Sequence, residues 1–145
     1  MTAEPKNAKK KLRIILDSNA LYASLQFKID IWEELKTLLK ANFETIILLQ
    51  VLQELEKLAE KGSPKMRKEA KYVLKLAEKC RVVNVSEEYA NTPDEAIVNA
   101  AHEWRCPVFT NDRELRKRLR DINVPVIYVR EKSHLEIDGR IRSPV

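Results

Sequence analysis

The chain has 145 residues, the length of one ordinary domain, and its 27 Lys and Arg against 22 Asp and Glu give a formal net charge of +5. A chain of this length can bury a hydrophobic core without disulfides or structural metals. Cys80 and Cys106 are far apart and form neither a disulfide framework nor a zinc motif, so we expect both to be small buried side chains. Because no apolar run approaches the ~20 residues that span a bilayer and no signal-peptide core is present, a soluble cytoplasmic protein with no membrane partner is expected.

The first predicted element is a buried β-strand at residues 12–16, LRIIL. Its almost continuous apolar side chains leave no polar face, as is typical of a strand covered on both sides in a parallel sheet. Residues 1–10 before it form a lysine-bearing tail that we expect to be disordered, so that residues 11–145 form the single domain. Asp17 follows the strand directly, at the edge where open α/β sheets bind ligands.

Helices and strands alternate along the rest of the chain. Apolar residues at helical spacing predict helices at residues 18–27, 30–41, 50–61, 64–77, 93–104 and 113–121. Short apolar runs predict further strands at residues 44–48, 81–85, 107–110 and 125–129, and a short hairpin is expected around Asp138 and Gly139. This alternation favours an α/β fold with a central parallel sheet of about five strands and helices on both faces.

Four acids fall where such a sheet would bring them to one edge. Asp17 and Asp112 each follow a predicted strand, while Asp94 and Glu54 lie near the start of the helices that follow two other strands. Glu54 stands beside the apolar face of its helix, half inside the expected cleft. Each acid alone is also explained by helix capping or by the helix dipole, so only the convergence of all four points to a site.

Four converging carboxylates repel one another, and a hard divalent cation would relieve this repulsion. Mg²⁺ and Mn²⁺ prefer oxygen ligands and keep waters that substrate phosphate can replace. If the acids surround a cation, the rest of the surface is more basic than the net charge suggests, which favours a polyanionic substrate. The pattern therefore indicates metal-assisted hydrolysis of a phosphodiester.

The segments LRIILDSNAL, VLQELEKL, TPDEAIVNAA and VFTNDREL resemble, in this order, the signature segments of PIN-domain ribonucleases. The resemblance implies a Rossmann-like sheet, endoribonuclease activity and a Mg²⁺ or Mn²⁺ cofactor. It also implies that Asp17, Glu54, Asp94 and Asp112 are the catalytic, metal-binding acids, with Glu95 a candidate to share the third position.

The resemblance leaves more than one function open. The closest likeness is to the PIN nucleases of small-subunit ribosomal RNA processing and their archaeal relatives, which implies a ribosomal RNA precursor as substrate. A VapC-type toxin ribonuclease with an antitoxin partner is one alternative, and a non-cleaving, RNA-binding ribosome-assembly factor is another. Family likeness also implies a homodimer.

Polar neighbours of the acids are expected to support them. Ser18 and Asn19 would cap the following helix or orient the neighbouring acid, and Thr110 and Asn111 would hold a water or phosphate, with helix capping as the alternative for Asn111.

Basic residues follow the last of the four acids. Arg113, Lys117 and Arg120 share one face of the predicted helix at residues 113–121, and Arg130 and Lys132 would extend this track. We expect these cations to bind RNA phosphates, the alternative being an ordinary solvated helix.

Overall fold

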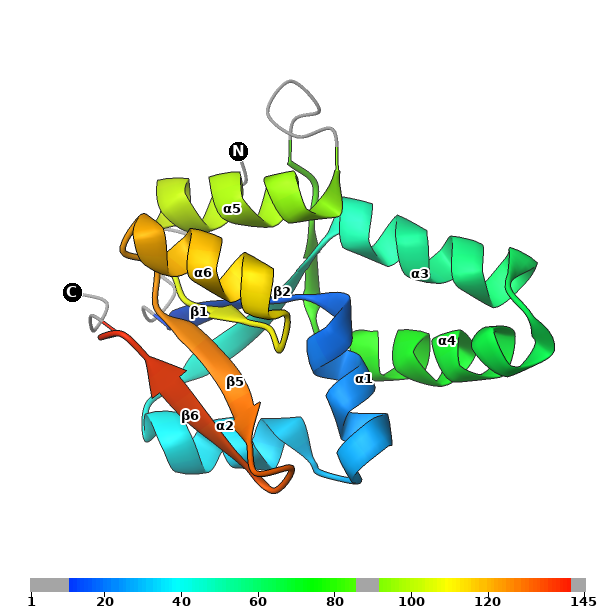
Figure 1. The fold of residues 1–145 in the computed structure, drawn as a ribbon, viewed down its shortest axis with the longest axis horizontal. Helices are drawn as coiled ribbons and strands as arrows, with labels where there is room; N and C mark the ends of the chain where they lie inside the picture. The colour runs from blue at the N-terminus through cyan, green and yellow to red at the C-terminus, as the bar shows by residue number, and fades with distance from the viewer. Residues whose placement is uncertain (1–10, 86–91, 142–145) are drawn as a thin grey trace.

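A six-stranded sheet lies at the centre of the computed structural model, which describes residues 11–85 and 92–141 (Figure 1). Its strands are β1 (Leu12–Leu16), β2 (Phe43–Leu48), β3 (Arg81–Val83), β4 (Val108–Phe109), β5 (Val126–Arg130) and β6 (His134–Asp138). The helices are α1 (Ser18–Phe27), α2 (Ile31–Leu39), α3 (Leu49–Lys61), α4 (Pro64–Ala77), α5 (Pro93–Trp104) and α6 (Arg113–Asp121). The strand order is β3-β2-β1-β4-β5-β6, and neighbours are parallel except β5 and β6. The expected α/β fold with a mostly parallel sheet is therefore confirmed, with one strand more than expected.

β1 lies in the middle of the sheet, between β2 and β4. Ile14, Ile15 and Leu16 are each 0% exposed, as the lack of a polar face predicted. Full burial of an aliphatic side chain is worth about 1.5–3 kcal/mol, so this strand contributes strongly to the core. The position of Asp17 is fixed as a result, because it continues directly from a strand held on both sides.

The helices divide between the two faces of the sheet (Figure 1). From β1 the chain moves outward through β2 to β3, then returns to the other side of β1 and continues through β4 to β5. Because parallel crossovers are right-handed, the two directions place their helices on opposite faces, α1 and α2 on one and α5 and α6 on the other. The direction reverses between β1 and β4, which is where such sheets form a ligand-binding crevice.

α3 and α4 pack side by side and project beyond the sheet (Figure 1). Gly62 ends α3, and the Ser63 hydroxyl caps α4 by accepting a hydrogen bond from the Met66 N–H at 3.3 Å, with Pro64 in the first turn. The stop and restart predicted here are therefore confirmed. No helix in the described ranges is long and apolar enough to cross a membrane.

The predicted hairpin around Asp138 and Gly139 is wrong in its position. The hairpin joins β5 to β6, and its turn contains Glu131 and Lys132 with φ of 54° and 59°, while Asp138 ends β6. Left-handed turns of this kind are usually signalled by Asn or Gly, so the sequence here gives no turn signal. The tail predicted to be disordered, residues 1–10, lies outside the described residues.

Both cysteines are free and buried, as expected. Burial raises the pKa of the Cys106 thiol to about 12, so its nucleophilic thiolate form is not populated near neutral pH. The two residues therefore serve as small apolar side chains of the core.

Candidate functional site

Asp17 lies at the carboxyl end of β1 and is only 7% exposed. It is itself the N-cap of α1, because its Oδ1 accepts a hydrogen bond from the Ser18 N–H at 2.7 Å. Its Oδ2 accepts a second hydrogen bond, at 2.9 Å, from the hydroxyl of Thr110 after β4. The side chain is thus fixed from both sides of the crevice between β1 and β4.

The segment after β4 is tied to its neighbours by a continuous hydrogen-bond network. The fully buried Thr110 hydroxyl donates to Asp17 and accepts from the Asp112 N–H at 3.1 Å. The Asn19 side-chain oxygen accepts from the Asn111 N–H at 2.9 Å, and the Asn111 side-chain oxygen accepts from the Val129 N–H on β5 at 2.8 Å. In this structure Asn19, Thr110 and Asn111 therefore hold the edge together, and neither asparagine side chain caps a helix.

Asp112 and Asp94 begin the two helices on the opposite face. Asp112 caps α6, since its Oδ1 accepts hydrogen bonds from Glu114 N–H and Leu115 N–H at 2.9 and 3.1 Å, and its Oδ2 has no such bond within the described residues. Asp94 is exposed in the first turn of α5, where Thr92 is the cap. Carboxylate oxygens on both residues therefore remain available to a ligand.

The three aspartates act on one another electrostatically. Burial raises the pKa of Asp17, the hydrogen bonds from Thr110 and Ser18 oppose this, and the charges of Asp94 and Asp112 raise it further. The pKa of Asp94 is also raised, first by burial and then by Asp112, while Arg118 opposes the shift. Three carboxylates from three separate segments thus converge on one edge of the sheet.

The chemistry of these donors fits a hard cation, although the side chains are not gathered as a finished metal site. Oxygen atoms are what Mg²⁺ and Mn²⁺ prefer, and mutual repulsion among carboxylates is what a cation relieves. Within residues 11–85 and 92–141, however, no three His, Cys, Asp or Glu side chains lie close enough to hold one ion. Hydrogen bonds from Ser18 N–H and the Thr110 hydroxyl engage both oxygens of Asp17, and hydrogen bonds from Glu114 N–H and Leu115 N–H engage Oδ1 of Asp112.

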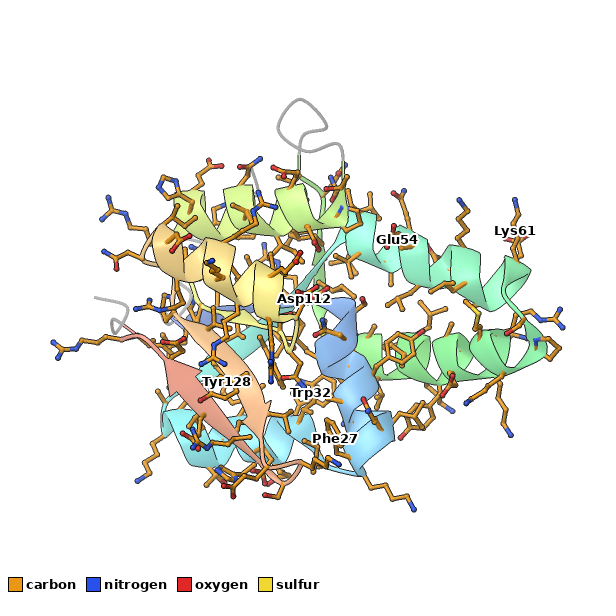
Figure 2. All side chains as sticks on the ribbon, in the orientation of Figure 1. Phe27, Trp32, Glu54, Lys61, Asp112 and Tyr128 are labelled. Carbon is orange, nitrogen blue, oxygen red and sulfur yellow. The ribbon has the colours of Figure 1, made fainter. Side chains whose placement is uncertain are left out.

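The two remaining acids of the prediction lie differently. Glu54 is exposed in the second turn of α3, apart from the chain segments that carry the three aspartates. Figure 2 labels both Glu54 on α3 and Asp112, which lies directly before α6. α3 packs against both α1 and α5, so Glu54 is carried by a helix that borders the edge. Glu95 forms an ion pair with Arg118 at 2.9 Å, an interaction across α5 and α6 that directs its carboxylate to α6.

The cations predicted to bind RNA fall into two groups. Arg113, Lys117 and Lys132 are exposed and have no ion pair within the described residues. Arg120 pairs with Asp138 at 3.2 Å, and Arg130 pairs with Glu136 at 3.2 Å. The structure therefore leaves the first group freer to meet a phosphate than the second.

Sequence reasoning missed two basic residues near the edge. Arg118 pairs with Glu95, and its charge opposes the rise in the pKa of Asp94. Arg116 pairs with Asp138 at 3.0 Å, and its guanidinium lies 3.8 Å from the centre of the Tyr128 ring. These contacts join α6 to α5 and to the β5–β6 hairpin. Only the packing of α6 against its neighbours creates them, so the sequence pattern offered no signal.

Comparison with known proteins places the chain in a family. The PIN-like domain family matches residues 14–132. Ribonuclease VapC4 of Methanocaldococcus jannaschii is 35% identical over 130 residues, covering 89% of this chain and 98% of that protein. The rRNA-processing protein FCF1 of Saccharomyces cerevisiae is 32% identical over 120 residues, covering 81% of this chain and 59% of that protein.

A solved structure agrees with these relatives. The PIN domain endonuclease Utp24 superposes with a TM-score of 0.72 at 30% identity, covering 89% of this chain and 92% of that one. Family match, sequence identity and fold thus coincide over nearly the whole described domain. The chain belongs to the PIN-like domain family.

Proposed function

We propose that this protein is a metal-dependent endoribonuclease that hydrolyses RNA phosphodiester bonds at the carboxyl edge of its sheet. The observation that carries the proposal is the convergence of Asp17, Asp94 and Asp112 at this edge. The charges of Asp94 and Asp112 raise the pKa of the buried Asp17. Such repulsion destabilises a fold unless a cation balances it. Similarity to ribonuclease VapC4 and to the endonuclease Utp24 supports the same activity.

The three aspartates would hold the ion, with Glu54 as a fourth ligand from α3 and Glu95 available only if it leaves Arg118. When bound, Mg²⁺ or Mn²⁺ would lower the pKa of an attacking water and balance charge on the phosphate. The chain contributes orientation, because the Thr110 hydroxyl fixes Oδ2 of Asp17 while Oδ2 of Asp112 accepts no hydrogen bond from residues 11–85 or 92–141.

Two relatives support two kinds of RNA substrate. Similarity to the rRNA-processing protein FCF1 supports a ribosomal RNA precursor, the substrate that we propose first. Similarity to ribonuclease VapC4 over 98% of that protein supports the toxin alternative, in which an antitoxin would be the partner. A small antitoxin gene directly upstream would favour the toxin function, and its absence would favour rRNA processing. In either case we expect a cytoplasmic homodimer.

The test of activity is cleavage of RNA by the purified protein with Mg²⁺ or Mn²⁺ and with a chelator. Asp94→Asn removes one charge but keeps the shape of the side chain at an exposed helix start that Thr92 caps. We expect cleavage to fall by at least about a hundredfold, since removing one group that stabilises transition-state charge typically has this effect. Circular dichroism should be unchanged.

Glu103→Gln is the matched control, because it removes one negative charge from an exposed position near the other end of α5. The control should cleave at the wild-type rate. Full activity of the folded Asp94→Asn protein would remove Asp94 from the site. A folded wild-type protein that binds RNA but never cleaves it with either metal would favour the non-cleaving assembly factor.

A further inference from the structure

α4 presents a line of four exposed side chains to solvent, which we call the α4 stripe: Lys65, Lys68, Tyr72 and Lys75. Their spacing of three, four and three residues places them on one side of the helix. At a rise of 1.5 Å per residue, the stripe is about 15 Å long. Tyr72 lies within it and is 47% exposed, although a large aromatic side chain is usually more buried.

The lysines of the α4 stripe are not neutralised by ion pairs in the part of the chain that the structure describes. The only acid of α4 is Glu69, which is half-buried and, four residues after Lys65 and three before Tyr72, borders the stripe on the side of the core. Its charge reaches α1, where burial and then Glu69 raise the pKa of Tyr22. The exposed charges within α4 are nevertheless all positive, and the nearest exposed acid along the chain is Glu78, directly after the helix.

Comparison with α3, the helix that packs against α4, shows that exposure to solvent alone does not explain why the exposed charges of α4 are all positive. The exposed charged residues of α3 are of both signs: Glu54, Glu56, Lys57, Glu60 and Lys61. Mixed charge is what an ordinary solvated helix carries, because it gives solubility without a strong field of one sign. The stripe on α4 differs, since it has lysines and one aromatic ring but no acid.

A groove of about 410 Å³ lies between α3 and α4. It is lined by Glu56, Ala59, Glu60, Arg67, Lys71 and Leu74. Glu56 and Glu60 of α3 therefore share this groove with two other cations of α4, Arg67 and Lys71, whereas no residue of the α4 stripe lines it. A polyanion that approaches the stripe meets no acid of this groove first.

The cations of α6 offer a comparison. Arg116, Arg118 and Arg120 are each held in an ion pair, so a phosphate must compete with a carboxylate for them. The stripe lysines have no such pair among the described residues, so counterions must balance their charge. Release of counterions is the main source of sequence-independent affinity for nucleic acid. An exposed aromatic ring among cations adds a platform on which any base can stack.

We infer that the α4 stripe is a second RNA-binding surface, separate from the edge of the sheet that carries Asp17, Asp94 and Asp112, which we call the acid edge. The stripe holds a single-stranded segment by its phosphates, with one base stacked on Tyr72. The inference rests on the proposed function for the identity of the polyanion. It adds to that function a reason why a long RNA would bind more tightly than a short one that reaches only the acids.

The test measures binding of a single-stranded RNA of about 30 nucleotides in chelator, where no cleavage occurs, over a series of salt concentrations. In Lys65→Gln/Lys68→Gln/Lys75→Gln, loss of three phosphate contacts should flatten the salt slope by about two units and weaken binding at low salt at least about tenfold. Lys and Gln have similar helix propensities, so α4 should remain folded.

The matched control is Lys36→Gln/Lys57→Gln/Lys61→Gln, which removes the same charge from exposed lysines outside the stripe. It should keep more of the affinity and the slope than the stripe variant does. Equal affinity and equal slope in the two triple variants would overturn the inference. So would a stripe variant that keeps its RNA affinity but loses binding to poly-glutamate, because the surface would then be a site for acidic protein.

Tyr72 supplies an independent readout. Tyr72→Ala should weaken RNA binding at least about fivefold without changing the salt slope, because stacking carries no counterion release. Tyr72→Phe keeps the ring and should keep the affinity, and an equal loss in both variants would contradict stacking. Wild-type protein that binds RNA through the stripe but never cleaves it would refute the proposed function and leave this inference standing.

Discussion

Thr110 is the side chain that joins the two sides of the crevice. It is 0% exposed and bonds both the Asp17 carboxylate and the Asp112 N–H. Thr110→Val keeps the shape but removes the hydrogen bonds to Oδ2 of Asp17 and from the Asp112 N–H, so the free energy of unfolding should fall by about 1–3 kcal/mol in urea titrations. Thr110→Ser keeps both hydrogen bonds and should retain cleavage. A serine variant as inactive as the valine variant would show that the hydroxyl is not what matters.

Asp17 should make stability depend on pH in an unusual direction. Its pKa in the folded protein is raised above the ordinary value of 3.8, so the native state binds this proton more tightly than the unfolded state does. Protonation therefore favours folding, and this contribution is lost as the pH rises from about 3.8 through the folded pKa. Above that window the ionised, buried carboxylate lowers stability.

Asp17→Asn removes the titrating group, and asparagine also caps helices. Without metal, the variant should be more stable than the wild type near neutral pH, and the difference should disappear as the pH falls below the window. Denaturant titrations in chelator between about pH 3 and pH 7 measure this. Asp30→Asn, at the exposed cap of α2, is the control and should show no such gain. A gain of equal size in the control would attribute the effect to capping.

The places of the three aspartates could be predicted from the sequence, because each follows a strand or opens a helix. Their role as metal ligands stays a prediction. The direction of Glu95 could not be predicted, since its partner Arg118 belongs to another helix. The same holds for the pairing of Arg120 with Asp138, because Asp138 belongs to β6, a strand that the sequence pattern did not predict.

At the scale of the element, α6 carries cations of two kinds: Arg113 and Lys117 have no ion pair among the described residues, whereas Arg120 pairs with Asp138. Arg113→Gln/Lys117→Gln should flatten the salt dependence of RNA binding by about 1.4 units, at −0.7 per phosphate for a single strand. Arg120→Gln should mainly lower the unfolding free energy, because it breaks a partly exposed pair with Asp138. The opposite assignment of effects, with Arg120 dominating the salt slope, would contradict this division.

Helix limits were predictable where side chains define them. The limits 18–27, 64–77, 93–104 and 113–121 match the structure because Asp17, Ser63, Thr92 and Asp112 cap those helices. β6 was missed because its hairpin turn uses Glu131 and Lys132, which adopt left-handed backbone without a glycine. Antiparallel pairing with β5 determines this turn, and pairing between strands is not visible in local sequence.

For the molecule as a whole, the repulsion at the acid edge predicts a response to metal. Mn²⁺ or Mg²⁺ at a hundredfold excess over its dissociation constant should stabilise the protein by about 2.7 kcal/mol, since the ion binds only the folded state. Thermal melts with and without metal measure the shift. Asp17→Asn should raise the melting temperature of the metal-free protein and abolish the metal response. A full response in that variant would exclude a site built on Asp17.

The hydrogen bond between Thr110 and Asp17 also affects when the cleft between β1 and β4 is assembled during synthesis of the chain. The two residues stand 93 positions apart. During synthesis from the N-terminus, β1 and β2 can pair while β4 is still unmade, and contacts of such long sequence separation form late. Asp17 therefore lacks its hydrogen bond from Thr110 until the C-terminal third of the chain has been synthesised. An incomplete nascent chain would therefore carry the proposed catalytic acids without an assembled cleft, and the proposed cleavage would begin only when synthesis has passed α6.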